Sequence, residues 1–138
     1  MCVPQKSILI VDDDKAILRV LTKLLAKRGF TVTAVETGFA ALIQIEKTCF
    51  DVALLDVRLP DMLGTDLLPV LRKVSPKTVR IIFTGSPSIE KGDRDHEDMD
   101  VFLVKPVSPE VLLNVLNEKL SLNNSSSKTG QHLPEPLV

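Results

Sequence analysis

The sequence predicts an α/β fold built on a parallel sheet. Five short β-rich runs alternate along the chain with segments of helical periodicity. Four of these runs are almost wholly apolar, which is typical of strands buried on both faces. Regular alternation of strands and helices indicates parallel strands whose crossover helices cover both faces of the sheet.

The expected strands follow from apolar runs bounded by polar residues. Residues 7–12 (SILIVD), 51–56 (DVALLD), 79–84 (VRIIFT) and 101–104 (VFLV) are nearly continuous in apolar character. We expect all four to be buried on both faces. Residues 31–35 (TVTAV) instead alternate between polar and apolar side chains, as an edge strand does.

Helical spacing of apolar residues predicts the elements between these strands. One face of residues 14–28 carries leucines and an isoleucine, and Gly29 is a plausible stop. A second helix starts at Thr37 or Gly38, and Thr65 is expected to cap a third. Ser108-Pro109-Glu110 reads as the start of a last helix, with the cap followed by a first-turn proline.

Two regions depart from this alternation. Residues 86–100 (SPSIEKGDRDHEDMD) occupy the place of a fourth helix but are mostly polar and acidic. We expect a short, poorly docked or partly unwound helix there, or a loop. Residues 123–138 contain NNSSSKTG and two prolines, so we divide the chain into a folded domain at 1–121 and a flexible tail or linker at 122–138.

Composition narrows the functional classes. The chain has 138 residues, enough for one domain with its own core. No apolar run approaches the roughly 18 residues of a membrane span, and the net charge of −1 provides no basic field for nucleic acid. We therefore expect a cytoplasmic protein that by itself binds neither membranes nor nucleic acid. Its two cysteines are expected to be reduced, with Cys49 an inert buried thiol.

Polar residues end four of the expected strands. The first ends in Asp12-Asp13-Asp14, the third in Asp56, the fourth in Thr84-Gly85 and the fifth in Lys105-Pro106. Each has a simpler explanation alone: Asp13 or Asp14 as a helix cap, Asp56 as a turn residue, and Lys105 as a solvated side chain. Because carboxyl ends of parallel strands share one edge of the sheet, their joint occurrence predicts a site there.

Phosphoryl transfer through a metal fits these residue types. Asp12, Asp13 and Asp56 offer the carboxylate oxygens that suit Mg²⁺. A carboxylate such as Asp56 can attack a phosphoryl group and form an aspartyl phosphate. Lys105 would neutralise charge on the transferred oxygens, and Thr84 could donate a hydrogen bond to one of them. The chain has no phosphate-binding loop and no GxGxxG motif, which argues against a bound nucleotide.

Four motifs in this order carry a family resemblance. ILIVDDD, LLDVRLPDMLG, IIFTGS and FLVKP resemble the receiver domain of two-component response regulators, the CheY-like fold. The resemblance covers about residues 6–121. It implies a five-stranded parallel sheet of flavodoxin-like order 2-1-3-4-5.

The resemblance also implies a role for each site residue. Asp56 is expected as the phosphoacceptor, and Mg²⁺ is expected to be held by Asp12, Asp13, Asp56 and the backbone carbonyl of Arg58. Lys105 and Thr84 are expected to stabilise the phosphoryl group. The Lys105–Pro106 bond is expected to be cis, and Thr84 and Phe102 are expected to act as the switch residues.

Partners follow from the same resemblance. The phosphoryl donor is expected to be a phosphohistidine on a sensor histidine kinase or a histidine phosphotransfer protein. The domain is expected to be a monomer or a phosphorylation-dependent dimer with an unknown output partner. It would catalyse only its own phosphorylation and dephosphorylation, and so is not expected to be an enzyme.

Two alternatives remain from other functional classes. A small metal-dependent phosphatase with an aspartyl nucleophile on the first strand is one, because Asp12-Asp13-Asp14 contains an Asp-x-Asp. The other is a receiver-like interaction module that phosphate does not control, which the unusual residues 86–100 favour mildly and the intact acid cluster opposes.

Overall fold

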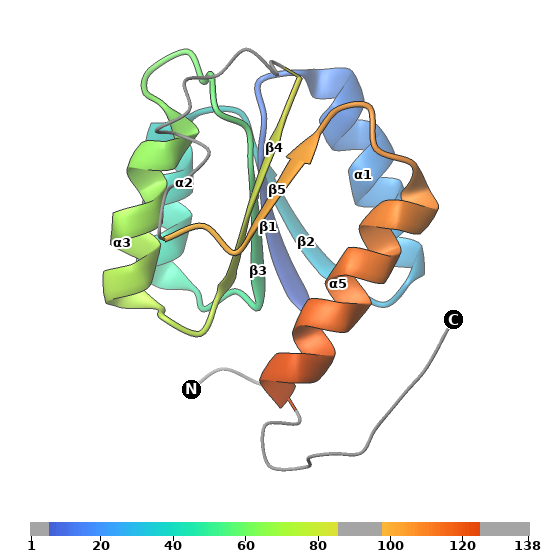
Figure 1. The fold of residues 1–138 in the computed structure, drawn as a ribbon. Helices are drawn as coiled ribbons and strands as arrows, with labels where there is room; N and C mark the ends of the chain where they lie inside the picture. Colours follow the sequence, from blue (N-terminus) through green and yellow to red (C-terminus); the bar gives the residue numbers. More distant parts are fainter. Residues whose placement is uncertain (1–5, 86–97, 125–138) are drawn as a thin grey trace. The chain divides into compact units, whose positions relative to one another are not determined.

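The sheet has five parallel strands in the order β2-β1-β3-β4-β5, as the flavodoxin-like expectation required (Figure 1). The computed structural model describes residues 6–85 and 98–124. The strands are β1 (Ser7–Val11), β2 (Thr31–Val35), β3 (Val52–Leu55), β4 (Val79–Thr84) and β5 (Val101–Val104). The helices are α1 (Lys15–Lys27), α2 (Gly38–Lys47), α3 (Leu67–Val74) and α5 (Pro109–Asn124), with a 3₁₀ turn, η1 (Gly64–Asp66), ahead of α3.

Helices cover both faces of the sheet. α1 lies on one face, while α2 and α3 lie side by side on the other (Figure 1). Alternate residues of β1 and β3 pack with α2 and α3 in one apolar cluster, because successive side chains of a strand point to opposite faces. The buried members of this cluster are Leu9, Val11, Ala41, Ile45, Phe50, Ala53, Leu55, Val57, Leu67, Leu68, Leu71 and Ile82.

Side-chain caps fix the starts of the first two helices. Asp14 is the N-cap of α1, and its carboxylate accepts from Ala16 N at 2.9 Å. Thr37 is the N-cap of α2, and its hydroxyl accepts from Ala40 N at 3.0 Å. Both side chains satisfy backbone donors that the first turn of a helix leaves without partners.

The third helix starts differently from expectation. Thr65 does not cap it, because Thr65 is buried inside the 3₁₀ turn and α3 begins only at Leu67. Gly64 N donates to Val57 O at 2.7 Å, which draws this turn against the end of β3. The sequence pattern gave no sign of that contact between neighbouring loop segments.

The fifth strand is less buried than its apolar sequence indicated. β5 pairs only with β4 and forms an edge of the sheet. Val101, Phe102 and Leu103 are half-buried and Val104 is exposed. The expectation of burial on both faces is therefore wrong for this strand, since an apolar run alone does not distinguish an edge strand from a central one.

The last helix belongs to a second compact unit, which begins at Ser108. Ser108 Oγ accepts from Val111 N at 3.1 Å, as a capping side chain does. Leu112, Leu116 and Leu120 recur every fourth residue and so share one helical face. Among the described residues, no helix is both long and apolar enough to cross a membrane.

Two further expectations concern Cys49 and residues 86–100. Cys49 is exposed and disulfide-bonded, so the expectation of a buried, reduced thiol is wrong. Cys2, the chain's other cysteine, lies outside the described residues. The expected irregular helix at residues 86–100 also falls mostly outside them, because the description resumes at Asp98.

Candidate functional site

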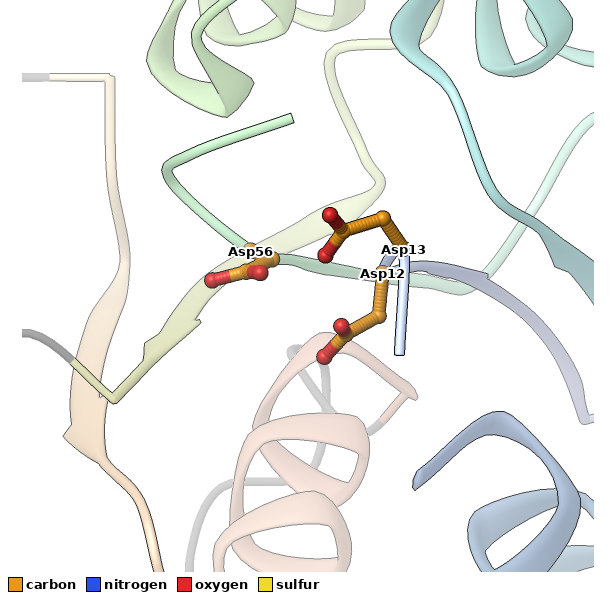
Figure 2. Close-up of side chains that lie close together, drawn as sticks. All are labelled: Asp12, Asp13 and Asp56. Carbon is orange, nitrogen blue, oxygen red and sulfur yellow. The ribbon is translucent and has the colours of Figure 1, made fainter. Parts of the chain in front are cut away.

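Two neighbouring strands bring three carboxylates together. β1 pairs with β3, and Asp56 N donates to Val11 O at 2.9 Å, so the residues following these strands lie side by side. Asp12 and Asp13 follow β1, and Asp56 follows β3. One oxygen from each of the three carboxylates lies within 4.8 Å of the others (Figure 2).

The three carboxylates differ in exposure and in their hydrogen bonds. Asp12 is 1% exposed and Asp56 is 8% exposed, whereas Asp13 is open to solvent. Asp12 Oδ1 accepts from Asp14 N at 2.9 Å, and Asp56 Oδ1 accepts from Val57 N at 2.9 Å. Backbone donors thus orient the two buried carboxylates, while Asp13 faces the solvent side of the cluster.

Lys105 brings a positive charge from the end of β5 to this cluster. Its Nζ donates to Asp12 Oδ2 at 2.5 Å and lies 3.7 Å from Asp56 Oδ2. The ammonium also lies 5.2 Å from the centroid of the Phe83 ring, within cation–π range. The Lys105–Pro106 peptide bond is cis. Lys105 therefore joins the cluster although 93 positions separate it from Asp12 in the sequence.

Burial raises the pKa of the Asp56 carboxyl above its ordinary value. The nearby charge of Asp12 raises this pKa further, and Asp13 contributes in the same direction. Lys105 and the hydrogen bond from Val57 N lower it, since both favour the charged form. Because the net direction is upward, the folded protein holds a carboxylate whose ionisation its surroundings oppose.

The other predicted site residues, Thr84, Phe102 and Arg58, differ in burial. Thr84 is the last residue of β4 and is 1% exposed, and its carbonyl accepts from Lys105 N at 2.7 Å. Phe102 lies on β5, is half-buried and packs against the core cluster next to α2 and α3. Arg58 is two residues beyond Asp56 and has an exposed side chain.

Two functional positions escaped the sequence reasoning. Asp61, in the loop after β3, accepts hydrogen bonds from Gly38 N at 2.9 Å and Phe39 N at 2.8 Å. Gly64 lies against the backbone of Asp56, where an added Cβ would come within 1.8 Å of the Asp56 carbonyl oxygen. Both residues follow a proline in PDMLG, but turn-forming residues are common and gave no sign of which backbone they approach.

The donor set of the cluster fits a hard divalent cation. Three carboxylates lie close together, and one ammonium pairs with two of them. The cluster therefore carries excess negative charge, and two of its carboxylates are buried away from water. Mg²⁺ binds through one or two carboxylates and retains several waters, which suits a cluster with one solvent-facing member. Among the residues that the structure describes, the cluster contains no sulfur or imidazole ligand, the kinds that softer metals prefer.

Comparison with known families identifies the chain. The sequence profile of the response regulator receiver domain matches residues 8–117. The chain belongs to this family. Its five-stranded fold and its edge of acidic residues are thus those of a receiver domain.

Individual relatives agree with this assignment. The chain is 36% identical over 107 residues to the sensory transduction protein RegX3 of Mycobacterium tuberculosis, covering 78% of this chain and 47% of that protein. It therefore spans about half the length of this relative. A CheY-like receiver domain protein from Methanospirillum hungatei superposes with a TM-score of 0.83 at 38% identity, covering 88% of this chain and 98% of the other.

A further solved structure includes bound ligands. The response regulator TrrA from Thermotoga maritima, in complex with Mg²⁺ and beryllium fluoride, matches at 25% identity with a TM-score of 0.75. The match covers 83% of this chain and 98% of that one.

Gly64→Ala is expected to disturb the backbone of Asp56. The new methyl group would lie 1.8 Å from the Asp56 carbonyl oxygen, and neither backbone segment can yield as a flexible side chain would. We expect a loss of about 1–3 kcal/mol in the free energy of unfolding, in the range of overpacked sites. Chemical denaturation measures the loss, and amide chemical shifts at residues 55–58 report the local displacement.

Gly85→Ala is the matched control for this substitution. Its added Cβ would meet only the Lys105 side chain, at 3.7 Å or more, which is ordinary van der Waals contact. The same stability for the two variants would contradict the close approach at Gly64.

Asp56→Asn is expected to stabilise the metal-free protein at neutral pH. A carboxyl whose folded pKa lies above its ordinary value of 3.8 favours folding below that value, and the contribution is lost as the pH rises through the folded pKa. Removing the charge should therefore raise the midpoint of urea unfolding at pH ~7 in the presence of a chelator. The advantage should vanish in acid, where the native carboxyl is neutral.

Asp61→Asn provides a control of opposite sign. Hydrogen bonds from Gly38 N, and then from Phe39 N, lower the pKa of Asp61, so this carboxylate stabilises the fold above its ordinary pKa. Its neutral variant should be less stable at neutral pH, with the difference fading in acid. An Asp56→Asn protein no more stable than wild type at neutral pH would show that Asp56 is not an unfavourable charge.

Proposed function

We propose that this chain is a phosphoacceptor switch. In this proposal a phosphohistidine of a sensor histidine kinase or phosphotransfer protein donates its phosphoryl group to Asp56 in an Mg²⁺-dependent reaction. The chain is a response regulator receiver domain, and such domains serve two-component signalling. The proposal of phosphoryl transfer to Asp56 rests on one observation. Asp12, Asp13, Asp56 and Lys105 converge at one edge of the sheet.

Asp56 is the best nucleophile of the three carboxylates. Asp12 is nearly inaccessible, and its Oδ2 is engaged by Lys105 at 2.5 Å. Asp56 Oδ1 is oriented by Val57 N, whereas Oδ2 lies 3.7 Å from Nζ, beyond hydrogen-bond length. Oδ2 is therefore the oxygen that would form the new P–O bond, while the P–N bond of the donor histidine breaks and its imidazole leaves with the electron pair.

Asp12, Asp13, Asp56 and the backbone carbonyl of Arg58 would hold the metal. When bound, Mg²⁺ supplies positive charge that offsets the charge of the transferring phosphoryl oxygens. Asp13 is the solvent-facing member of the set, so it offers an oxygen without losing a buried hydrogen bond. The Mg²⁺ and beryllium fluoride in the TrrA complex support a magnesium site in this chain by family likeness.

Lys105 and Thr84 would stabilise the phosphorylated state. Nζ of Lys105 lies between Asp12 and Asp56, where it can pair with a phosphoryl oxygen as it now pairs with carboxylates. The hydroxyl of Thr84 is a donor at the end of the neighbouring strand. Thr84 ends β4 and Lys105 follows β5. A change of charge at Asp56 would therefore act on both of these strands.

Thr84 and Phe102 would transmit the change to a partner-binding face. β4 pairs with β5, and Ile82 lies opposite Phe102 in this ladder. A shift of Thr84 toward a phosphoryl oxygen would change the space beside Phe102, which already packs against the core. Such a shift would change the relative populations of two conformations of the partner-binding face, and so its affinity for a partner.

Three properties of the protein stay predictions: its cytoplasmic location, the choice between monomer and phosphorylation-dependent dimer, and the identity of the output partner. The domain boundary after residue 121 is likewise a prediction. The phosphatase alternative finds no support in the family assignment, and the complete acid cluster opposes a module that phosphate does not control.

Asp56→Asn is expected to abolish labelling by acetyl phosphate. The wild-type chain should gain the mass of one phosphoryl group in the presence of Mg²⁺, as acetate leaves and a P–O bond forms at Asp56. Intact-mass spectrometry measures the gain. Continued labelling of Asp56→Asn would refute the assignment, and a phosphoryl group found on Asp12 in that variant would favour the phosphatase.

Asp13→Asn is expected to weaken Mg²⁺ binding without unfolding the protein. The loss should be at least on the order of 10-fold, the effect typical of losing even an outer-shell partner of a metal ligand. Asp14→Asn is the matched control, because it removes the same charge one residue away and asparagine still caps the helix. Equal Mg²⁺ affinities for the two variants, measured by calorimetry, would exclude Asp13 as a ligand.

A further inference from the structure

We propose that Asp61 is a positioning residue that fixes the loop between β3 and α3 by fastening it to the start of α2. The inference rests on the proposed function, because this loop carries the Arg58 carbonyl assigned to the metal. The loop comprises residues 57–64, and it directly follows Asp56.

Both carboxylate oxygens of Asp61 are used in this attachment. Oδ1 accepts from Gly38 N at 2.9 Å and Oδ2 accepts from Phe39 N at 2.8 Å. These are the first two backbone donors of α2, where the helix dipole also favours a negative charge. The pKa of Asp61 is lowered by these two hydrogen bonds, as expected for a carboxylate that is held in its charged form.

A side-chain contact locks the same junction. An added Cβ on Gly38 would meet the Met62 side chain at 2.3 Å, so the loop packs directly on the helix start. Met62 is half-buried and belongs to the rim of the core cluster. Asp61 and Met62 therefore dock the tip of the loop on α2 by polar and apolar contacts together.

Backbone hydrogen bonds carry this attachment from the tip to the base of the loop. Leu59 N donates to Met62 O at 3.2 Å, and Arg58 and Leu63 form an antiparallel bridge. At the base, Gly64 N donates to Val57 O at 2.7 Å. Arg58 thus lies in a short hairpin whose tip is Asp61, so the position of the tip restricts the position of the Arg58 carbonyl.

The start of α2 is a firm anchor without help from Asp61. Thr37 caps the helix from within, through Ala40 N, and Ala41 and Ile45 hold it in the core. The strand before it is also tied to the site, because Asp12 N donates to Val35 O at 3.1 Å. Asp61 is exposed and is not part of the core, so its main effect should fall on the loop rather than on the helix.

The test compares Asp61→Ala with Thr37→Val in the full chain. Both variants remove a side-chain acceptor from the first turn of α2, but only the first releases the loop. We expect Mg²⁺ affinity, measured by calorimetry with MgCl₂, to fall on the order of 10-fold in Asp61→Ala and to change by less than about twofold in Thr37→Val. Similar unfolding midpoints for the two variants would show that lost stability is not the cause.

Amide exchange gives a readout that metal binding does not influence. In chelator, residues 58–63 should exchange faster in Asp61→Ala but not in Thr37→Val. Asp61→Asn should give an intermediate Mg²⁺ affinity, because asparagine keeps one acceptor oxygen and loses the other.

The outcomes separate this inference from the proposed function. Equal Mg²⁺ affinities for Asp61→Ala and Thr37→Val, or unchanged exchange of the loop, would overturn the positioning role while the wild-type protein still bound Mg²⁺ and accepted phosphate. Failure of the proposed function would instead appear in the wild-type protein, as neither Mg²⁺ binding nor labelling. That result would remove the positioning role with it.

Discussion

The ion pair between Lys105 and Asp12 makes the crowded acid edge of this sheet possible. Three carboxylates lie within 4.8 Å of one another, and two of them are buried. Such a cluster is unfavourable unless a cation offsets it. Lys105 reaches Asp12 from the end of β5, past the ends of β4 and β3, with its ammonium beside the Phe83 ring. Gly85 leaves room along the stem of this side chain, since even an added Cβ there would lie 3.7 Å from Lys105.

One ammonium does not balance three carboxylates, and the raised pKa of Asp56 reflects the remainder. The fold thus retains a carboxylate that weakens it at neutral pH, as functional sites often do. Binding of a divalent cation, or a rearrangement around a new phosphoryl group, would change the charge balance at this edge. The same event at an edge without excess charge would have a smaller effect. For that reason the electrostatic cost and the proposed switching ability have the same origin.

The sequence predicted those features that depend on a regular period or on a strand's end. Apolar runs identified the strands, and helical spacing identified α1, α2 and α5. The parallel arrangement then placed Asp12, Asp56 and Lys105 at one edge without further information. Features set by contacts between irregular segments were not predictable in this way. Thr65 looked like a cap but is buried in a 3₁₀ turn, and the attachment of Asp61 to α2 joins residues 23 and 22 positions apart.

The opposite end of the same strands shows that the charge imbalance is local. Ahead of β5, Asp98 pairs with Arg72 of α3 at 2.8 Å, and Asp100 lies 3.6 Å from Arg80 of β4. In the described part of the chain, Asp98 and Asp100 therefore each have an arginine beside them, and Asp51 ahead of β3 accepts hydrogen bonds from Ser7. At the carboxyl end, Lys105 is the one described cation within ion-pair distance of Asp12 and Asp56, and no described cation lies that close to Asp13. The same sheet has paired acids at one end and an excess of carboxylates at the other. The composition of the chain therefore does not explain the excess. The excess of carboxylates is specific to the edge where a cation and a phosphoryl group would bind.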